Sequence, residues 1–398
     1  MSSGPKQAAG ELGEKHSGGR ALAGFLLSGF LFALLGAILP AWGYHRDPTD
    51  FVAVGNYFLS IGVGIGIAGL LARRVEARRG VPFLLISACL LSCCALIFLA
   101  LAPPASTWWR VLGLLVLGIG AGSLNLALFH SISGIYRRDA AGTVVRGGIW
   151  YGLGSLAATL LVFGTFYAYG VTTILLFMAA VPAIFAGLYY KSSFPAEPAE
   201  PHLTIRRVLN DFRSPGAVLF ALLLFFQFGN EYSIAGWLPI FLYRRVGFSP
   251  QGALLLLAVY WLFLMAGRLG AIAILPRMRH GRLLLLSGAS ALFGCMILFV
   301  TDNAFGAYMG ALFIAAGYAS IYPLVAEAIG RRFPYYHPGF FSGIFSLALI
   351  GGLLAPATLG YAAESLGVGV VIGIPLLGTF MVMALLVLIW LESKITGR

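Results

Sequence analysis

Charged residues are scarce in this chain of 398 residues. Asp, Glu, Lys and Arg together make up only 10% of it, whereas hydrophobic residues reach 60%. A soluble domain carries about 25% charged residues, which cover its surface. The composition therefore excludes an ordinary water-soluble domain and indicates that lipid is the solvent for much of the chain.

Acidic residues are rarer still, at 14 against 26 Lys and Arg, which gives a net charge of +12. Such an excess can indicate nucleic-acid binding. Here the basic residues lie in short clusters between apolar stretches, so no nucleic-acid partner is expected. No Walker sequence occurs, which argues against an ATP-driven pump. Four cysteines lie within apolar runs and predict neither a disulfide framework nor a zinc site: Cys89, Cys93, Cys94 and Cys295.

Apolar stretches recur along the chain at a length of about 20 residues, which is what a helix needs to cross a bilayer. The sequence predicts an all-α integral membrane protein with twelve transmembrane helices in two six-helix halves. The domains expected are a leader 1–20, a first half 21–190, a linker 191–215, a second half 216–392 and a tail 393–398. The spans are expected near 21–44, 51–72, 81–102, 109–135, 142–168, 171–190, 216–243, 250–275, 283–301, 304–329, 338–362 and 367–391.

The loops between these stretches differ in positive charge. If the N-terminus is inside, the outer loops hold only Arg46, Arg110, Arg244 and Arg245. Lys and Arg in short loops are retained on the cytoplasmic side. We therefore expect both termini and the linker to be cytoplasmic, in a protein of the cytoplasmic (inner) membrane that acts as a monomer. A central linker between two six-span halves is typical of a two-repeat transporter.

The loop after the second stretch contains Gly69, Arg73, Glu76, Arg78 and Arg79. With these residues it resembles the corresponding loop of the major facilitator superfamily, and the resemblance extends from about residue 20 to 392. The superfamily motif is a Gly, an Asp and a cluster of Arg or Lys. Gly69 and the pair Arg78 and Arg79 fit it, whereas Arg73 takes the Asp position and Glu76 is the nearest acid. The resemblance implies a major facilitator fold and a gating role at the inner face for Arg73, Arg78 and Arg79.

Four segments of the second half stand out: Phe228–Leu238, Gly267–Gly270, Ala319–Pro323 and Ile350–Gly360. In these segments the chain is similar to the fucose/galactose/glucose permease group, which implies a sugar or sugar-like substrate. Proton-coupled members of that group have acids in spans one and four. This chain has none in either, and Asn125 is the nearest polar residue in span four.

Polar side chains inside the spans are the strongest candidates for a site. A charged group at the bilayer centre costs about 2.5–3.5 kcal/mol or more, and Glu231 lies close to the middle of its span. Gln227, Asn230 and Glu231 follow the spacing i, i+3, i+4, which places them on one helix face. We predict that this face binds substrate hydroxyls between the halves, opposite Asn125 and Trp150. The alternative is a polar network that only joins helices.

Glu231 is the acid whose loss should damage transport most. It would couple transport to H⁺, since burial favours its protonated form, or it would bind substrate without coupling. Coupling to Na⁺ stays open, and no cofactor or metal is expected. On this interpretation Asn230→Ala weakens substrate binding but leaves folding intact.

Two further charged groups lie nearer the inner face. Arg268 in span eight has two possible roles, a pair with Glu231 or an anchor for the inner helix ends, and we favour the anchor. Glu327 precedes Arg331 by four residues, which predicts an ordinary helix-end pair. His130 in span four is expected to be a hydrogen-bonded packing residue rather than a proton relay.

Aromatic side chains at matching depth are candidates for stacking on a sugar ring. With 14% aromatic residues overall, most must pack in the core or face lipid. The candidates are Trp150, Tyr151, Tyr260, Trp261, Tyr318 and Tyr322.

The favoured function is thus transport of a small polar organic solute. A multidrug or lipophilic-metabolite exporter is the alternative that 30 Phe residues keep open. An integral membrane enzyme is disfavoured, because no clustered His, Asp and Glu motif lies near a span end.

Overall fold

The computed structural model of the chain describes residues 5–46, 48–101, 106–190, 192, 212–274, 277–333 and 344–396. These residues contain helices and no strand. The helices are α1 (Pro5–Ile38), α2 (Phe51–Ala100), α3 (Thr107–Ser131), α4 (Ser133–Arg138), α5 (Ala140–Thr165), α6 (Val171–Tyr190), α8 (Pro215–Phe241), the π-helix η1 (Leu242–Val246), α9 (Pro250–Ile274), α10 (His280–Val300), α11 (Ala304–Arg332), α12 (Ile344–Leu366) and α13 (Val370–Thr396).

Eleven of the helices in the described part of the chain are long and apolar enough to cross a bilayer. Helix α2 has 50 residues, which at 1.5 Å per residue is about 75 Å, more than twice the ~30 Å hydrocarbon core. It is broken at Gly80, whose φ of 80° suits glycine alone. Helix α2 therefore supplies two spans, and the predicted all-α fold with twelve spans is confirmed.

The observed helix boundaries differ from the predicted spans most clearly at the N-terminal end and after α3. Helix α1 begins at Pro5, inside the stretch predicted as a leader, and a short α4 follows α3. Most of the predicted linker 191–215 lies outside the described residues.

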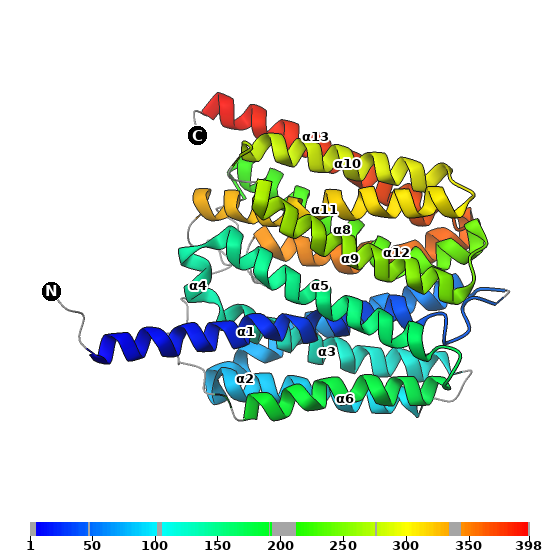
Figure 1. Cartoon of the computed structure of the whole chain (residues 1–398), viewed down its shortest axis with the longest axis horizontal. Helices are drawn as coiled ribbons and strands as arrows, with labels where there is room; N and C mark the ends of the chain where they lie inside the picture. The colour runs from blue at the N-terminus through cyan, green and yellow to red at the C-terminus, as the bar shows by residue number, and fades with distance from the viewer. Residues whose placement is uncertain are drawn as a thin grey trace.

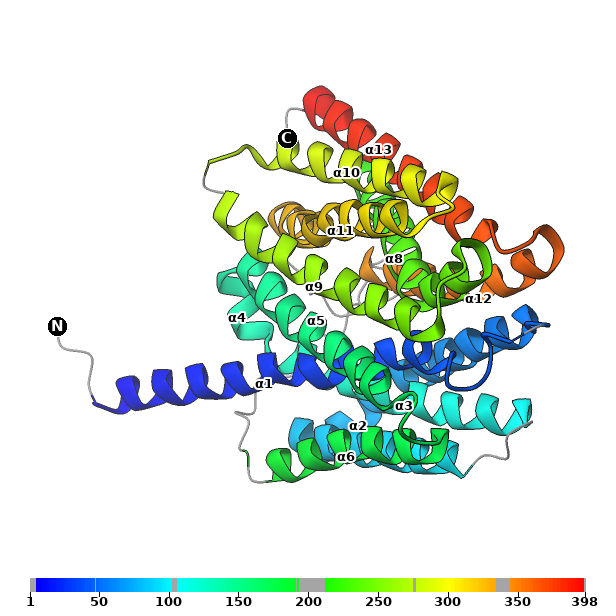
Figure 2. The same ribbon diagram turned by 45° about the vertical axis from the view of Figure 1, so that its right-hand side comes forward.

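Two groups of helices lie side by side, α1 to α6 and α8 to α13 (Figures 1 and 2). Corresponding helices pack in the same way in each group: α1 on α5 and α8 on α12, or α2 on α6 and α10 on α13. The two groups, called the N-terminal and C-terminal halves below, meet through α5 on α9, α2 on α12 and α1 on α8. This arrangement has the two six-helix halves that the sequence predicted.

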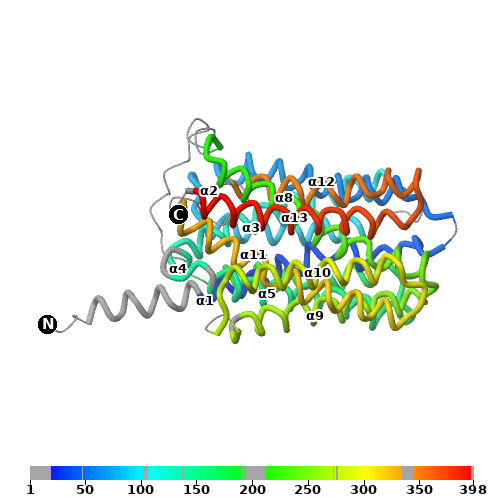
Figure 3. The backbone as a smooth tube through the Cα atoms, turned by 90° about the horizontal axis from the view of Figure 1, so that it is seen from above, coloured from blue at the N-terminus to red at the C-terminus, as the bar shows by residue number. Residues whose placement is uncertain are grey.

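Helix α1 starts and α13 ends at the same end of the bundle (Figure 1), and Figure 3 shows α13 ending on the side from which α1 enters the bundle. We call this the terminus end, and it is the end predicted to be cytoplasmic. The opposite end, where α8 runs into η1 and α9 begins, is called the far end.

Small residues set the closest helix contacts. A Cβ atom on Gly29 of α1 would overlap the backbone carbonyl of Tyr151 in α5, and one on Gly154 of α5 would overlap that of Leu26. Helices in lipid approach this closely only through small residues. The α1–α5 contact places Tyr151 against α1 at the centre of the molecule.

Candidate functional site

An arginine–glutamate pair of the C-terminal half lies against the N-terminal half. Glu231 of α8 and Arg268 of α9 are 3.5 Å apart between Oε1 and Nη2, and their side chains are 13% and 7% exposed. Two opposite charges at this depth lower each other's cost of burial. The pairing that the sequence favoured less is therefore the one observed, because α8 and α9 turn both side chains to the same side.

Arg268 also reaches the N-terminal half. Its Nη1 donates a hydrogen bond to the backbone carbonyl of Gly148 in α5. A Cβ atom on Gly148 would lie 2.8–3.1 Å from three atoms of the guanidinium group, so the absence of a side chain at this position makes room for Arg268. The charged pair is thus linked to α5 through a backbone oxygen.

Aromatic rings from both halves surround this pair. The Tyr151 hydroxyl of α5 donates to the Tyr232 hydroxyl of α8 at 3.5 Å. Phe32 of α1 lies 6.3 Å from Tyr151 and 5.8 Å from Tyr232 between ring centres. These rings belong to what we call the central cluster: Phe32, Tyr151, Phe228, Tyr232, Trp261 and Tyr322.

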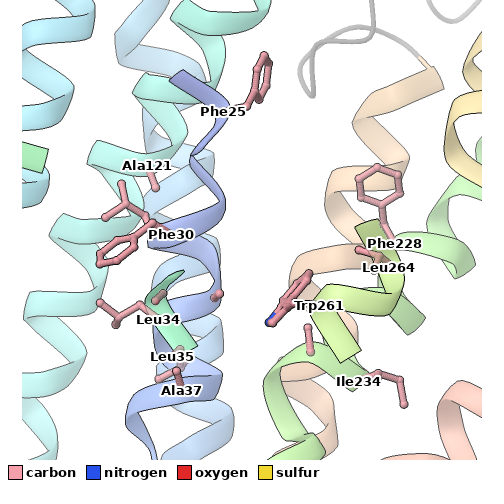
Figure 4. Close-up of a cluster of buried hydrophobic side chains, with 14 of the residues drawn as sticks. Phe25, Phe30, Leu34, Leu35, Ala37, Ala121, Phe228, Ile234, Trp261 and Leu264 are labelled. Carbon is pink, nitrogen blue, oxygen red and sulfur yellow. The ribbon is translucent and has the colours of Figure 1, made fainter. Parts of the chain in front are cut away.

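Several buried donors around the pair have no hydrogen-bond partner among the described residues. They are the Tyr260 hydroxyl, Trp261 Nε1, the Tyr322 hydroxyl and Arg268 Nε. Tyr260 and Tyr322 lie within electrostatic range of both Glu231 and Arg268. Figure 4 shows Trp261 pointing from α9 toward α1, with its indole nitrogen on that side. These groups are able to donate to a polar solute held between the halves.

Gln227 and Asn230 share the α8 face with Glu231 but differ in their surroundings. Gln227 is completely buried beside the Glu231 carboxylate. Asn230 turns toward α13 and donates to the Thr379 hydroxyl at 3.3 Å. The Asn230 side chain thus points in another direction from that of Glu231, because neighbouring residues on a helix lie about 100° apart around its axis.

Tyr318 belongs to the same polar network as Asn230. Its hydroxyl lies 2.8 Å from Thr379 Oγ1 and 3.8 Å from Cys295 Sγ. This network joins α8, α10, α11 and α13 inside the C-terminal half. Its geometry is that of the helix-joining alternative, with the Tyr318 hydroxyl bonded inside the C-terminal half.

In the N-terminal half, Asn125 and Trp150 also lie apart from Glu231. Asn125 is buried, and its Oδ1 accepts from Ser28 at 2.8 Å, which ties α3 to α1. Trp150 is 38% exposed, whereas its neighbour Tyr151 contacts the C-terminal half. Trp150 and Tyr151 are adjacent on α5, so their side chains point in different directions, and only Tyr151 faces the C-terminal half.

The predicted gating residues lie at the terminus end. Arg73, Arg78 and Arg79 are exposed on α2. Glu327 pairs with Arg331 at 2.7 Å, as predicted, and also with His280 at 3.3 Å.

His130, expected to be a packing histidine, lies 2.6 Å from Glu76 Oε1. The acid that stands near the superfamily's missing Asp is therefore paired within the N-terminal half.

Contacts between the halves occur toward both ends. At the far end, Arg244 Nε donates to the Thr49 hydroxyl at 2.8 Å, and Phe58 stacks on Trp237 with ring centres 5.8 Å apart. Toward the terminus end, the Tyr136 hydroxyl donates to the backbone carbonyl of Ala326 at 3.4 Å. The central cluster is thus bracketed by contacts on both sides.

Sequence reasoning missed Phe32, Gly148 and Tyr232. Tyr232 had a signal, since it follows Glu231 directly inside the Phe228–Leu238 segment. Gly148 and Phe32 had none, because one of many glycines and one of 30 Phe residues carry no mark of their neighbours in space. No group of three or more His, Cys, Asp or Glu able to hold a metal occurs among the described residues.

Comparison with known proteins gives one family. A model described as Major Facilitator Superfamily matches residues 21–356. A relative from Yersinia pestis, described as an uncharacterized MFS-type transporter, is 24% identical over 366 residues, which cover 88% of this chain and 89% of the relative.

Solved structures with the same fold include three transporters. The xylose transporter XylE from E. coli, in a partially occluded inward open conformation, has a TM-score of 0.72 at 14% identity and covers 94% of this chain and 97% of its own. The nucleoside transporter NupG has 0.69 at 16%, with 93% and 99% covered. The transporter FucP in the outward conformation has 0.63 at 16%, with 92% and 98% covered. At these identities the likeness shows the fold alone.

Proposed function

This chain belongs to the major facilitator superfamily of membrane transporters, and on that premise we propose that it carries a sugar or sugar-like solute across the cytoplasmic membrane by alternating access. The observation that carries the proposal is the Glu231–Arg268 pair surrounded by the central cluster. A polyhydroxylated ring needs hydrogen-bonding groups for its hydroxyls and flat aromatic faces for its C–H groups. Both are present between the halves.

Fold neighbours agree with this class of solute. Their descriptions name a fucose:proton symporter, a D-xylose-proton symporter and a nucleoside transporter, and each named solute carries several hydroxyl groups. For alternating access the two halves must separate at one end while they touch at the other. Contacts between the halves such as Arg244–Thr49 at the far end and Tyr136–Ala326 toward the terminus end would therefore break and re-form in turn.

Uptake into proteoliposomes, measured with a panel of labelled sugars, tests the proposal. We expect at least one to accumulate or exchange, and Glu231→Gln to separate the roles of that residue. If Glu231 couples transport to H⁺, the variant loses pH-driven accumulation yet keeps exchange. If Glu231 only binds, affinity falls and pH dependence stays. If the variant transports like the wild type at every pH, Glu231 has only a structural role.

A lipophilic-metabolite exporter is the second candidate, because Phe32, Phe228 and Trp261 place large apolar faces beside a single acid. The same liposomes distinguish it. Efflux of lipophilic dyes, with no movement of any sugar in the panel, would replace the first proposal with the second.

The orientation proposed has both termini in the cytoplasm. Ser192 follows α6 at the terminus end, so a cysteine introduced at Ser192 in a variant without native cysteines should resist membrane-impermeant reagents in intact cells. Labelling from outside would overturn the topology.

A further inference from the structure

The central charged pair is long for one so deeply buried. Arg268 Nη2 and Glu231 Oε1 are 3.5 Å apart, whereas Arg331 and Glu327 at the terminus end approach to 2.7 Å although Arg331 is 63% exposed. Charge-assisted N–H···O bonds normally measure about 2.7–2.9 Å. Arg268 is therefore held beside Glu231 without the close hydrogen bond that the chain forms elsewhere.

One edge of the Arg268 guanidinium is left available. Its Nη1 is bonded to the Gly148 carbonyl, while Nε has no hydrogen-bond partner among the described residues and Nη2 lies at 3.5 Å from Glu231. In a guanidinium group, Nε–H and one N–H of Nη2 point the same way. This edge is the one that binds both oxygens of a carboxylate.

Two further buried donors lie on α9, the helix that carries Arg268. The Tyr260 hydroxyl and Trp261 Nε1 have no acceptor among the described residues, and both side chains are at most 2% exposed. Buried donors are normally hydrogen-bonded. A ligand with several acceptor oxygens would complete the site.

We propose that the transported solute is a sugar acid or a similar polyol carboxylate, whose carboxylate binds the Nε–Nη2 edge of Arg268 in place of Glu231. The inference rests on the proposed function and names the solute class of the same site. The hydroxyls of the solute accept from Tyr260 and Trp261. Its ring lies against the central cluster.

Charge balance then requires one proton for each carboxylate. At rest Glu231 and Arg268 cancel. An arriving carboxylate adds one negative charge, and Glu231, left without its partner in a membrane interior, binds one proton from water because an unpaired buried charge is costly. One anion and one proton cross together, so no net charge moves. A pH gradient drives this transport, and a membrane potential does not.

Paired probes that differ at one carbon test the inference in proteoliposomes: D-glucuronate with D-glucose, and D-galacturonate with D-galactose. We expect at least one acid to enter tenfold or more faster than its neutral partner when the outside is acidic. A potential set with K⁺ and valinomycin should leave its rate unchanged. Arg268→Gln should abolish the preference.

The double variant Glu231→Gln/Arg268→Gln covers the case in which Arg268→Gln alone does not fold, since it leaves no unpaired charge. It should fold, as judged by gel filtration and circular dichroism, and show no preference for acids. Faster uptake of the neutral sugars, or acid uptake that follows the potential, overturns the inference but leaves the proposed function standing. If no acid and no sugar moves, the proposed function falls with it.

Discussion

In the C-terminal half, α8 and α9 hold Glu231 and Arg268 3.5 Å apart, whereas the N-terminal half meets this pair with a backbone carbonyl, at Gly148, and with the rings of Phe32 and Tyr151. The two halves pack their helices in corresponding ways, yet they contribute different chemistry at the centre. Corresponding helix positions therefore need not carry corresponding functions.

At the terminus end, by contrast, the two halves carry similar groups. His130 of α3 faces Glu76 of α2, and Glu327 of α11 faces His280 of α10. The two halves place an imidazole–carboxylate pair at similar corners, with the two residue types exchanged. The halves thus share their end contacts and differ where a solute would bind. At the centre, the C-terminal half carries the charged pair, and the N-terminal half contributes the Gly148 carbonyl and aromatic rings.

Arg268→Ala should produce the largest loss of stability in this comparison. It leaves the Glu231 carboxyl buried without its partner, so the group must either stay charged there or take up a proton, at a cost of about 3–5 kcal/mol of unfolding free energy. Unfolding in mixed detergent micelles measures the change. Arg331→Ala is the matched control, since an exposed pair contributes only about 0–1 kcal/mol. Equal losses in the two variants would show that the central pair is no more important to stability than a surface pair.

Gly148→Ala should disrupt the contact between the N-terminal half and Arg268. The added methyl group displaces the guanidinium group, so we expect uptake to fall by about tenfold or more, equivalent to about 1.4 kcal/mol. Gly147→Ala is the control, because a Cβ there meets Phe25 at an ordinary 3.5 Å. If both variants transport alike, Gly148 does not position Arg268.

Asn230→Ala should lower stability rather than binding, contrary to the expectation from the sequence. It removes the donor to Thr379 inside a buried network, at a cost of about 1–3 kcal/mol. Thermal unfolding and solute affinity, measured on the same preparation, separate the two effects. A weaker affinity for the solute with an unchanged unfolding temperature would show instead that Asn230 binds the solute.

The spans were predictable because length and hydrophobicity are properties of a single segment. Even the break in α2 falls between two predicted spans, at Gly80. The site was predictable only in part. Sequence gives the depth of a residue along a helix, and so it identified Glu231 and Tyr151. It does not give the rotation of a helix against its neighbours, which turned Asn230 toward α13 and left Trp150 exposed.

Tyr151→Phe should have the smallest effect on transport. It tests whether the two halves are coupled through the Tyr151 hydroxyl as well as through Arg268. The Tyr151–Tyr232 hydrogen bond is 3.5 Å long, near the limit for such a bond, so its removal should cost no more than about 0.5–1.5 kcal/mol. The ring keeps its contacts with Phe32 and Trp261. Because the bond crosses between the halves, the loss should appear in the exchange rate more than in unfolding. Tyr232→Phe should have the same effect, and the double variant should add nothing to either single change. Trp150→Phe, one position away on the exposed side of α5, is the control and should transport as the wild type does. If the two tyrosine variants are additive, the hydroxyls act separately on the solute, and the link between the halves lies in Arg268 alone.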